Sequence, residues 1–281
     1  MKKKILIVDG SNLLFQMFFG MPARIYNAQG VGIWGVLGFT GALLKIIRQV
    51  RPSHVCVLFD GEHENRRALI DSDYKANRAD YSQVDDSENP FSQLPYIYRA
   101  LDHLGIAYAE TEACEVDDWI SGYAHTYGAD NDMVISSFDS DFFQLISRSV
   151  TVLRYRGDKS VLCTPEYFME KFGIEPCQYA DFKSLTGDPS DNIPGADKVG
   201  PKTAAALLQE FGSLENILQN AQSIKKPSIR ESIARNTGRL RRNYALIRLD
   251  KQGDVPFTLE QMRFADPGIT TTQVLQAIGL K

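Results

Sequence analysis

Short apolar runs alternate with stretches of helical periodicity along most of the chain. The runs at 4–8, 54–59 and 133–138 are nearly continuous, and each is followed directly by an aspartate. Apolar residues recur at helical spacing between them, as at 33–50 and 91–104. Continuous apolar runs separated by helices are typical of strands buried in a parallel sheet. We therefore predict an α/β fold with a mainly parallel central sheet flanked by helices.

Local patterns after these runs predict three further elements. Residues 106–109 form a short apolar run that we interpret as a strand. The runs at 150–155 and 161–163 flank Gly157-Asp158 and predict a β-hairpin. Thr164 followed by Pro165 predicts the start of a helix, since threonine is a good N-cap and proline is favoured in the first turn.

Acidic residues gather at the carboxyl ends of the predicted strands. Right-handed crossovers bring the carboxyl ends of parallel strands to one edge of a sheet. A single strand-end aspartate is often only a helix cap, but independent capping does not explain several acids at one edge. The acids that we place at this edge are Asp9, Asp60, Asp139 and Asp141.

A carboxylate triplet opens the helix predicted after residue 114. Glu115 and Asp118 are three residues apart and share a helix face, and Asp117 lies about 100° round from Asp118. The helix dipole explains one acid in a first turn. Three acids this close repel one another unless a cation or a proton intervenes. We therefore predict that the triplet and the strand-end acids converge on one place.

The stretch 61–90 is long and polar, and it leaves directly from Asp60. Such a stretch is typical of a lid or functional loop, or of disorder. Lys75 and Arg78 would share one helix face, which is solvated by default but could meet a phosphate beside a carboxylate cluster. In the aromatic helix expected after Asp9, Phe15 is either a core residue or, at the site edge, a residue that stacks on a base.

A second informative stretch spans 185–204. Asp188 and Asp191 are followed by a tight Gly/Pro hairpin, and a helix is predicted to begin at Pro201. Free backbone N–H groups at this N-terminus, with Lys202 beside them, would form an anion or phosphate site. Basic residues concentrate from 225 to 248, and they form either a solvated helix face or a surface that follows phosphates.

Composition changes this picture little. The chain has 281 residues, 43% of them hydrophobic, enough for one large body or two small domains. A net charge of −4 does not indicate nucleic-acid binding, although acids that hold metal would mask a basic surface. Four cysteines without a CxxC pair predict reduced thiols in a cytoplasmic protein without structural zinc. No apolar run could span a bilayer, and the N-terminal run is too short for a signal sequence.

Taken together, these motifs resemble the 5′-nuclease family: bacterial and phage flap endonucleases and the 5′→3′ exonuclease domain of bacterial DNA polymerase I. The resemblance runs almost end to end. It implies a helical arch over 61–90 and a helix–hairpin–helix region, with a nuclease core over 1–184, a helical region over 185–281 and no polymerase domain. The segments that carry it are 7–11, 52–60, Arg67, 74–78, 115–118, 139–141 and 187–195.

The resemblance implies two or more divalent ions, Mg²⁺ or Mn²⁺, about 4 Å apart. With no ion present so many acids could not all ionise, so some pKa values should rise. Asp117 and Asp139 are assigned catalytic roles. By resemblance, the first ion is surrounded by Asp9, Asp60, Glu115 and Asp117. The second ion is held by Asp139, Asp141 and Asp188. Asp118 and Asp191 are expected to act through water.

The resemblance also implies contacts to DNA. Lys75 and Arg78 would grip the scissile phosphate. Many bacterial members have an arginine on the first helix where this chain has Gln16, so that phosphate contact is not assigned here. In the family a K⁺ ion often lies at the hairpin. The remaining residues expected to bind DNA are Arg67 and Tyr74 in the arch and Lys198, Gly200, Lys202 and Thr203 in the hairpin.

The implied activity is cleavage of 5′ flaps and 5′ ends of branched DNA to leave 5′-phosphates, by a monomer that has no membrane partner. Two alternatives stay open. A catalytically weak DNA-structure-binding protein would be favoured by loss of Asp188 or Asp191, but both are present. A PIN-type ribonuclease shares the strand-end acids but gives no reason for the hairpin at 185–204.

Overall fold

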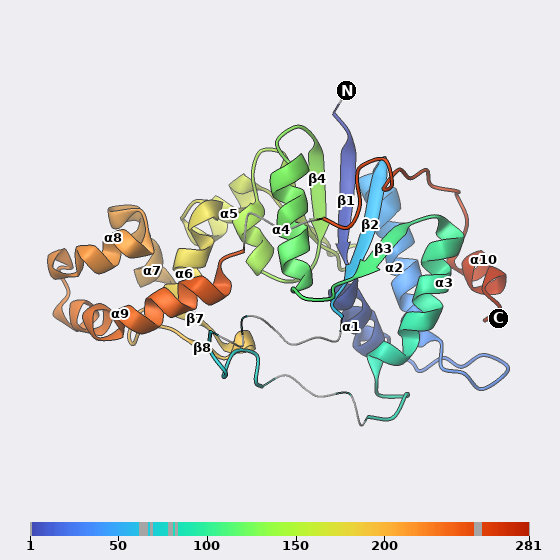
Figure 1. The fold of residues 1–281 in the computed structure, drawn as a ribbon, viewed down its shortest axis with the longest axis horizontal. Helices are drawn as coiled ribbons and strands as arrows, with labels where there is room; N and C mark the ends of the chain where they lie inside the picture. The colour runs from blue at the N-terminus through green and yellow to red at the C-terminus, as the bar shows by residue number, and fades with distance from the viewer. Residues whose placement is uncertain are drawn as a thin grey trace.

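The fold is built on one six-stranded sheet (Figure 1). The computed structural model describes residues 2–61, 67, 70–77, 81, 84–249 and 255–280. The strand order is β3-β2-β1-β4-β5-β6; neighbours are parallel except β6, which pairs antiparallel with β5. The predicted mainly parallel sheet and the hairpin are confirmed. The strands are β1 (Lys4–Asp9), β2 (His54–Phe59), β3 (Ala107–Glu110), β4 (Asp132–Ser136), β5 (Val150–Arg154) and β6 (Val161–Cys163).

Strand β1 lies in the middle of the sheet and sets the position of the acidic residues. Its register pairs Asp9 with Leu58 of β2 and Val8 with Ser136 of β4. The carboxyl ends of these three strands therefore meet at one edge, as their parallel direction requires. Asp9 ends β1, and Asp60 and Asp139 follow β2 and β4 closely.

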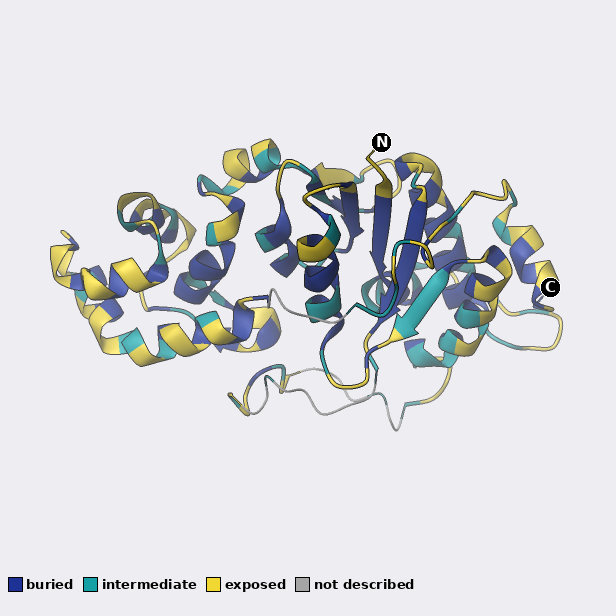
Figure 2. Cartoon of the chain, turned by 45° about the horizontal axis from the view of Figure 1, so that its top comes forward, coloured by how far each residue is buried: buried dark blue, intermediate teal, exposed yellow. Residues whose placement is uncertain are grey.

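Helices cover both faces of the sheet, because successive strand side chains point to opposite faces. Leu6 and Val8 pack into one apolar core, and Ile5 and Ile7 pack into another. Figure 2 shows the strands buried and the outer helix faces exposed. The first core is covered by α1 (Gly10–Gly20), α2 (Trp34–Val50), α3 (Leu94–Leu104) and α10 (Thr271–Ala277), and the second by α4 (Val116–Tyr127), α5 (Pro165–Phe172) and α6 (Tyr179–Thr186).

The second half of the chain adds a helical region at one end of the molecule (Figure 1). After α6 the chain forms a two-stranded hairpin, and the predicted helix at Pro201 is α7. The last segment then returns to the sheet, where Val55 N–H donates to the Met262 carbonyl at 2.8 Å. The elements of this region are β7 (Gly187–Asp188), β8 (Ile193–Pro194), α7 (Pro201–Phe211), α8 (Leu214–Gln219) and α9 (Pro227–Ile247).

The other predicted boundaries agree closely with the structure. Thr164 caps α5 by accepting a hydrogen bond from the Tyr167 N–H at 3.3 Å, and Pro165 opens the helix. A 3-10 turn over Asp141–Leu145 follows the end of β4. No helix in the described part of the chain is long and apolar enough to cross a membrane.

The arch over 61–90 differs from its prediction. In this range the structure describes Gly61, Arg67, 70–77, Tyr81 and 84–90. Residues 72–77 form turns instead of a helix, and Lys75 has a left-handed φ of 56°. The expected helix face is therefore absent at Lys75, and Arg78 lies outside the described residues.

Candidate active site at the carboxyl edge of the sheet

Asp9 is buried at the end of β1 and is held by two hydrogen bonds. Its carboxylate accepts from the Asn12 N–H at 2.9 Å and from the Ser137 hydroxyl at 2.8 Å. The first bond caps α1, so the aspartate that ends the strand also begins the helix. Burial, together with the negative charge of Asp60, raises the pKa of Asp9 to about 7.

Asp60 connects the end of β2 to the start of α4. Its carboxylate accepts from the Val116 N–H at 2.9 Å, and its own N–H donates to the Ser11 hydroxyl at 2.8 Å. The Asp60 carboxylate thus satisfies a free N–H group in the first turn of α4, whose N-cap residue Glu115 makes no side-chain cap. This bond directs the carboxylate triplet toward the sheet edge.

Asp117 is buried among the strand-end acids. Burial raises its pKa well above the usual value, and the negative charges of Asp139, Asp60 and Asp9 add to the effect. These four carboxylates come from the ends of three strands and the first turn of one helix. The structure therefore brings Asp117 of the triplet close to Asp9, Asp60 and Asp139, and their role in binding cations stays a prediction.

Glu115 and Asp118 are paired with bases of the arch. Arg67 contacts both carboxylates, with 2.7 Å between its guanidinium and the Asp118 carboxylate, and the Lys75 ammonium contacts Glu115. Both basic side chains are 11% exposed. Burial alone would lower the pKa of Arg67, but the negative charge of Asp118 outweighs this effect and raises that pKa. Lys75, predicted to contact the scissile phosphate, and Arg67, predicted to bind DNA, are thus both paired with acids here.

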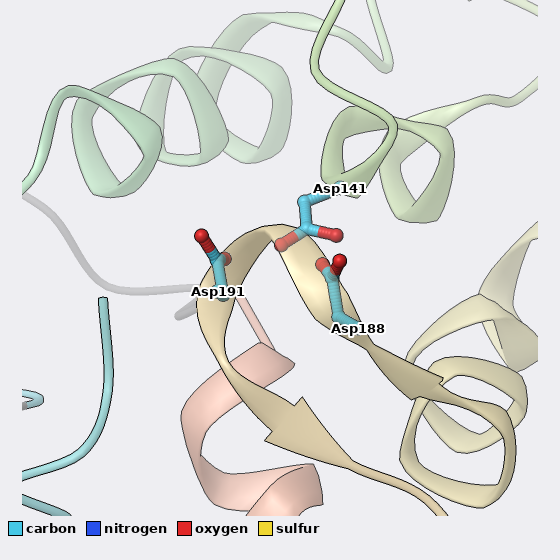
Figure 3. Close-up of side chains that lie close together, drawn as sticks. All are labelled: Asp141, Asp188 and Asp191. Atoms are coloured by element: carbon cyan, nitrogen blue, oxygen red, sulfur yellow. The ribbon is translucent and has the colours of Figure 1, made fainter. Parts of the chain in front are cut away.

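A second carboxylate group lies where the β7–β8 hairpin meets the body (Figure 3). Asp141, Asp188 and Asp191 are buried, and one oxygen of each lies within 4.8 Å of the others. We expected Asp191 to be an outer residue, but it belongs to this group. Burial raises the pKa of Asp141 to about 6, despite the opposing charge of Lys183.

Asp139 links the two carboxylate groups. Its carboxylate accepts from the Asp141 N–H at 2.8 Å, and its own N–H donates to the Ser137 hydroxyl at 2.9 Å. The Ser137 hydroxyl also donates to the Asp9 carboxylate, so this one hydroxyl connects Asp9 with Asp139. We call the complete set the acidic edge: Asp9, Asp60, Glu115, Asp117, Asp118, Asp139, Asp141, Asp188 and Asp191.

Lys183 is a site residue that the sequence patterns did not indicate. Its ammonium contacts Asp141 and Asp188, and the residue is 7% exposed. Although burial alone would raise it, Lys183 and the Ser190 hydrogen bonds lower the pKa of Asp188. No local pattern in the sequence identifies it, because the burial of residues 179–185 of α6 becomes visible only in the structure.

The acidic edge fits hard divalent cations. Its donors are all carboxylate oxygens, which Mg²⁺ and Mn²⁺ prefer. The pKa increase expected without an ion is confirmed at Asp9, Asp117 and Asp141. These carboxylates are too close together to ionise at the same time. A cation that binds several of them would relieve their repulsion and stabilise their ionised forms.

The predicted phosphate site lies at the N-terminus of α7. Gly200 is the N-cap and makes no side-chain cap, and Lys198 before it has a left-handed φ of 64°. Gly200, Lys198 and Lys202 are exposed, and Thr203 is half-buried. The backbone N–H groups and two ammonium groups are thus accessible at this turn, away from the acidic edge.

Phe15 and Gln16 of α1, the stacking candidate and the residue in place of the family's arginine, both contact other residues of the protein. Phe15 packs against Tyr81 and Phe91, with ring centroids 5.6 and 5.4 Å away. Gln16 donates to the Tyr155 carbonyl at 2.8 Å. Phe15 is half-buried in this aromatic cluster, and Gln16 is hydrogen-bonded to the chain after β5.

Comparison with known families agrees with this architecture. Residues 4–173 match the N-terminal resolvase-like domain of 5′-3′ exonucleases, and residues 174–269 match their C-terminal SAM fold. The chain belongs to the 5′-3′ exonuclease family, which confirms the resemblance inferred from the sequence.

Relatives and solved structures of the same kind support this assignment. A 5′-3′ exonuclease of Aquifex aeolicus is 32% identical over 282 residues, covering 99% of this chain and 93% of that protein. DNA polymerase I of Streptococcus pneumoniae is 34% identical over 274 residues, covering 95% of this chain. The chain spans only 31% of the length of that polymerase.

Two solved structures share the fold. The T5 D15 protein co-crystallised with metal ions has a TM-score of 0.71 at 20% identity, covering 87% of this chain and 89% of that one. The catalytic core of Rad2 in complex with DNA substrate has a TM-score of 0.59 at 14% identity, covering 99% of this chain and 92% of that one.

Proposed function

We propose that this chain is a divalent-metal-dependent 5′ nuclease that cleaves 5′ flaps and 5′ ends of branched DNA and leaves 5′-phosphates. The observation that carries the proposal is the acidic edge: nine carboxylates contributed by the ends of parallel strands, the start of α4 and the β7–β8 hairpin. The metal ions and the DNA named for the T5 and Rad2 structures give further support.

The acidic edge offers two places for divalent ions. We assign Asp9, Asp60, Asp117 and Glu115 to the first, and Asp141, Asp188 and Asp191 to the second, with Asp139 between them. Ions held there would activate the attacking water and offset the charge of the transferring phosphoryl group. Mg²⁺ is the proposed ion, since it binds through few carboxylates and keeps several waters; Mn²⁺ is expected to replace it.

Basic residues of the chain would hold the DNA. Lys75 lies beside Glu115, and its flexible side chain can reach toward the scissile phosphate; we assign Arg78 to the same phosphate and Arg67 to the DNA backbone. The exposed turn at Lys198, Gly200, Lys202 and Thr203 would bind the duplex backbone away from the cut, with K⁺ at the same turn. These residues would contact phosphates and not base edges, so we propose that the protein cleaves DNA without a sequence preference. We also propose that the protein acts as a cytoplasmic monomer.

A nuclease assay on three substrates tests the proposal. Purified protein should cut flap DNA in Mg²⁺ and lose this activity in a chelator, with much less cutting of single-stranded RNA or blunt duplex. Asp139→Asn should abolish cleavage but leave flap binding within roughly tenfold, because backbone contacts carry most of the affinity. Tight binding without cleavage by the wild type would favour the weak DNA-structure binder. Preferential RNA cleavage would favour the PIN-type ribonuclease.

A further inference from the structure

Lys183 occupies the second carboxylate group, the place where the proposed function needs a divalent ion. Its ammonium contacts Asp141 and Asp188, two of the three carboxylates whose oxygens lie within 4.8 Å of one another. Lysines are almost never this buried unless they are paired. Lys183 therefore takes carboxylate oxygens that an ion at this place would also need.

The backbone that carries Lys183 is held by its surroundings. The Asn243 side chain of α9 donates to the Ser184 carbonyl at 3.1 Å, and the neighbouring Phe182 and Leu185 are buried. Helix α6 therefore cannot shift easily to withdraw the ammonium. The flexible four-carbon stem of lysine can still move its charge by a few ångströms.

The charges of this group show what Lys183 contributes. Three carboxylates this close repel one another, and one ammonium between two of them relieves part of that repulsion. The same ammonium repels an incoming cation, and both compete for the same oxygens. A residue that stabilises the metal-free arrangement must therefore weaken binding of the ion that replaces it.

We propose that Lys183 is a built-in cation for the second carboxylate group. It holds Asp141 and Asp188 in place before a divalent ion arrives, and it lowers the affinity of the group for that ion. When an ion binds, the ammonium must leave these oxygens for another anion. A DNA phosphate is the anion that the proposed function brings to this place, so the ion and the DNA favour each other's binding. The inference rests on the proposed function for the divalent ion and for the DNA phosphate.

Mn²⁺ binding to the metal-free protein without DNA tests this role. Calorimetric titration and electron paramagnetic resonance of free Mn²⁺ would count the ions and rank their affinities. In Lys183→Met the weaker ion should bind at least about tenfold more tightly than in the wild type, since one repelling charge is gone. Lys171→Met is the matched control: it removes one ammonium from exposed Lys171 of α5, which donates to the Tyr167 hydroxyl at 3.2 Å and lies near the Tyr167 and Phe172 rings. Its affinities should be unchanged.

Stability provides a second readout. Metal-free Lys183→Met should melt at a lower temperature than the wild type because Asp141 and Asp188 lose their partner, and saturating Mn²⁺ should remove most of the difference. If this variant does not fold without metal, Lys183→Gln keeps an N–H donor but no charge, and it should show the same gain in affinity.

The outcomes separate this inference from the proposed function. If wild type and both variants bind Mn²⁺ equally, or the variants bind it more weakly, Lys183 does not act as a competing cation, while the nuclease proposal stands. If neither the wild type nor any variant binds Mn²⁺, both proposals fail. Binding by the variants alone would support a strong competing role for Lys183.

Discussion

Three basic side chains balance part of the charge at the acidic edge. Within the described part of the chain, Arg67, Lys75 and Lys183 pair with Glu115, Asp118, Asp141 and Asp188. The pKa values of buried Asp9 and Asp117 are raised. Each base is therefore already bound to an acid. Cations that bind the carboxylates would release these bases, so metal binding and phosphate binding are expected to reinforce each other.

Lys75 tests whether such a released base acts in the chemical step. A compact ammonium beside the scissile phosphate would stabilise charge as it develops, and loss of one such donor typically costs on the order of 10²–10³-fold. We expect Lys75→Ala to lose about this factor in single-turnover rate at saturating enzyme, while its flap Kd barely changes. Lys171→Ala is the control for loss of one positive charge. A normal rate at saturating enzyme would show that Lys75 contributes affinity alone.

The elements that could be predicted carry their own local signal. Strands β1, β2 and β4 are continuous apolar runs. The sequence therefore predicts both these strands and the acids that follow them. The pairing of Lys183 is not legible, because it depends on how α6 packs beside the turn at Asp141. Locally, a lysine in a helix looks like any solvated lysine.

Lys75 and Arg78 were predicted to share one helix face in the arch, but residues 72–77 form turns, and the packing of this segment explains why. Asn192 donates to the Asp73 carbonyl at 2.9 Å, and the Lys75 N–H donates to the Asp191 carbonyl at 3.1 Å. Arg242 of α9 pairs with Asp71 at 2.9 Å. These tertiary bonds replace the helical bonds that the local spacing of charges suggested.

Tyr74 anchors this turn to the helical region. It is 7% exposed and packs in an apolar cluster with Ile193, Leu246 and Ile247, while its hydroxyl lies 3.4 Å from Glu115. The DNA contact predicted for Tyr74 would need a rearrangement of the turn. In this structure the ring connects Lys75 and the β7–β8 hairpin to α9.

Substitution of Tyr74 distinguishes an anchor from a DNA contact. Tyr74→Ala should lower the free energy of unfolding by about 3 kcal/mol, because a buried ring is replaced by a cavity. Tyr74→Phe keeps the ring and should cost less than about 1 kcal/mol. Urea unfolding of the metal-free variants measures both. An unchanged stability of Tyr74→Ala together with weaker flap binding would show that Tyr74 is a DNA contact.

At the scale of the whole molecule, the acidic edge joins segments that are far apart in the sequence. Asp9 comes from the first strand, and Asp188 and Asp191 come from the hairpin after α6. Repulsion between these carboxylates at this junction therefore weakens the packing of the β7–β8 hairpin against the sheet. A boundary between domains near residue 184 stays a prediction, although cations at the junction would stabilise both sides of it.

The pH dependence of stability follows from the same charges. Burial and neighbouring acids raise the pKa of Asp9 to about 7 and that of Asp141 to about 6, from 3.8 for the ordinary group. The folded protein therefore binds more protons than the unfolded chain between about pH 4 and 7, so these groups make it less stable as the pH rises through that range. A carboxyl whose pKa is higher by one in the folded protein than in the unfolded chain changes the free energy of unfolding by about 1.4 kcal/mol across this range.

We therefore expect the melting temperature of the metal-free protein to fall as the pH rises from 5 to 8, measured by calorimetry in a chelating buffer. Mg²⁺ should reverse the fall, because it binds the ionised carboxylates and is bound more tightly as protons leave. Asp9→Asn keeps an oxygen to accept from Asn12 but has no charge, so its melting temperature should depend less on pH. Asp130→Asn, at an exposed position, is the control and should behave like the wild type. A melting temperature that rises from pH 5 to 8 without metal would mean that the acidic edge is fully ionised in the folded protein and is stabilised by its own bases.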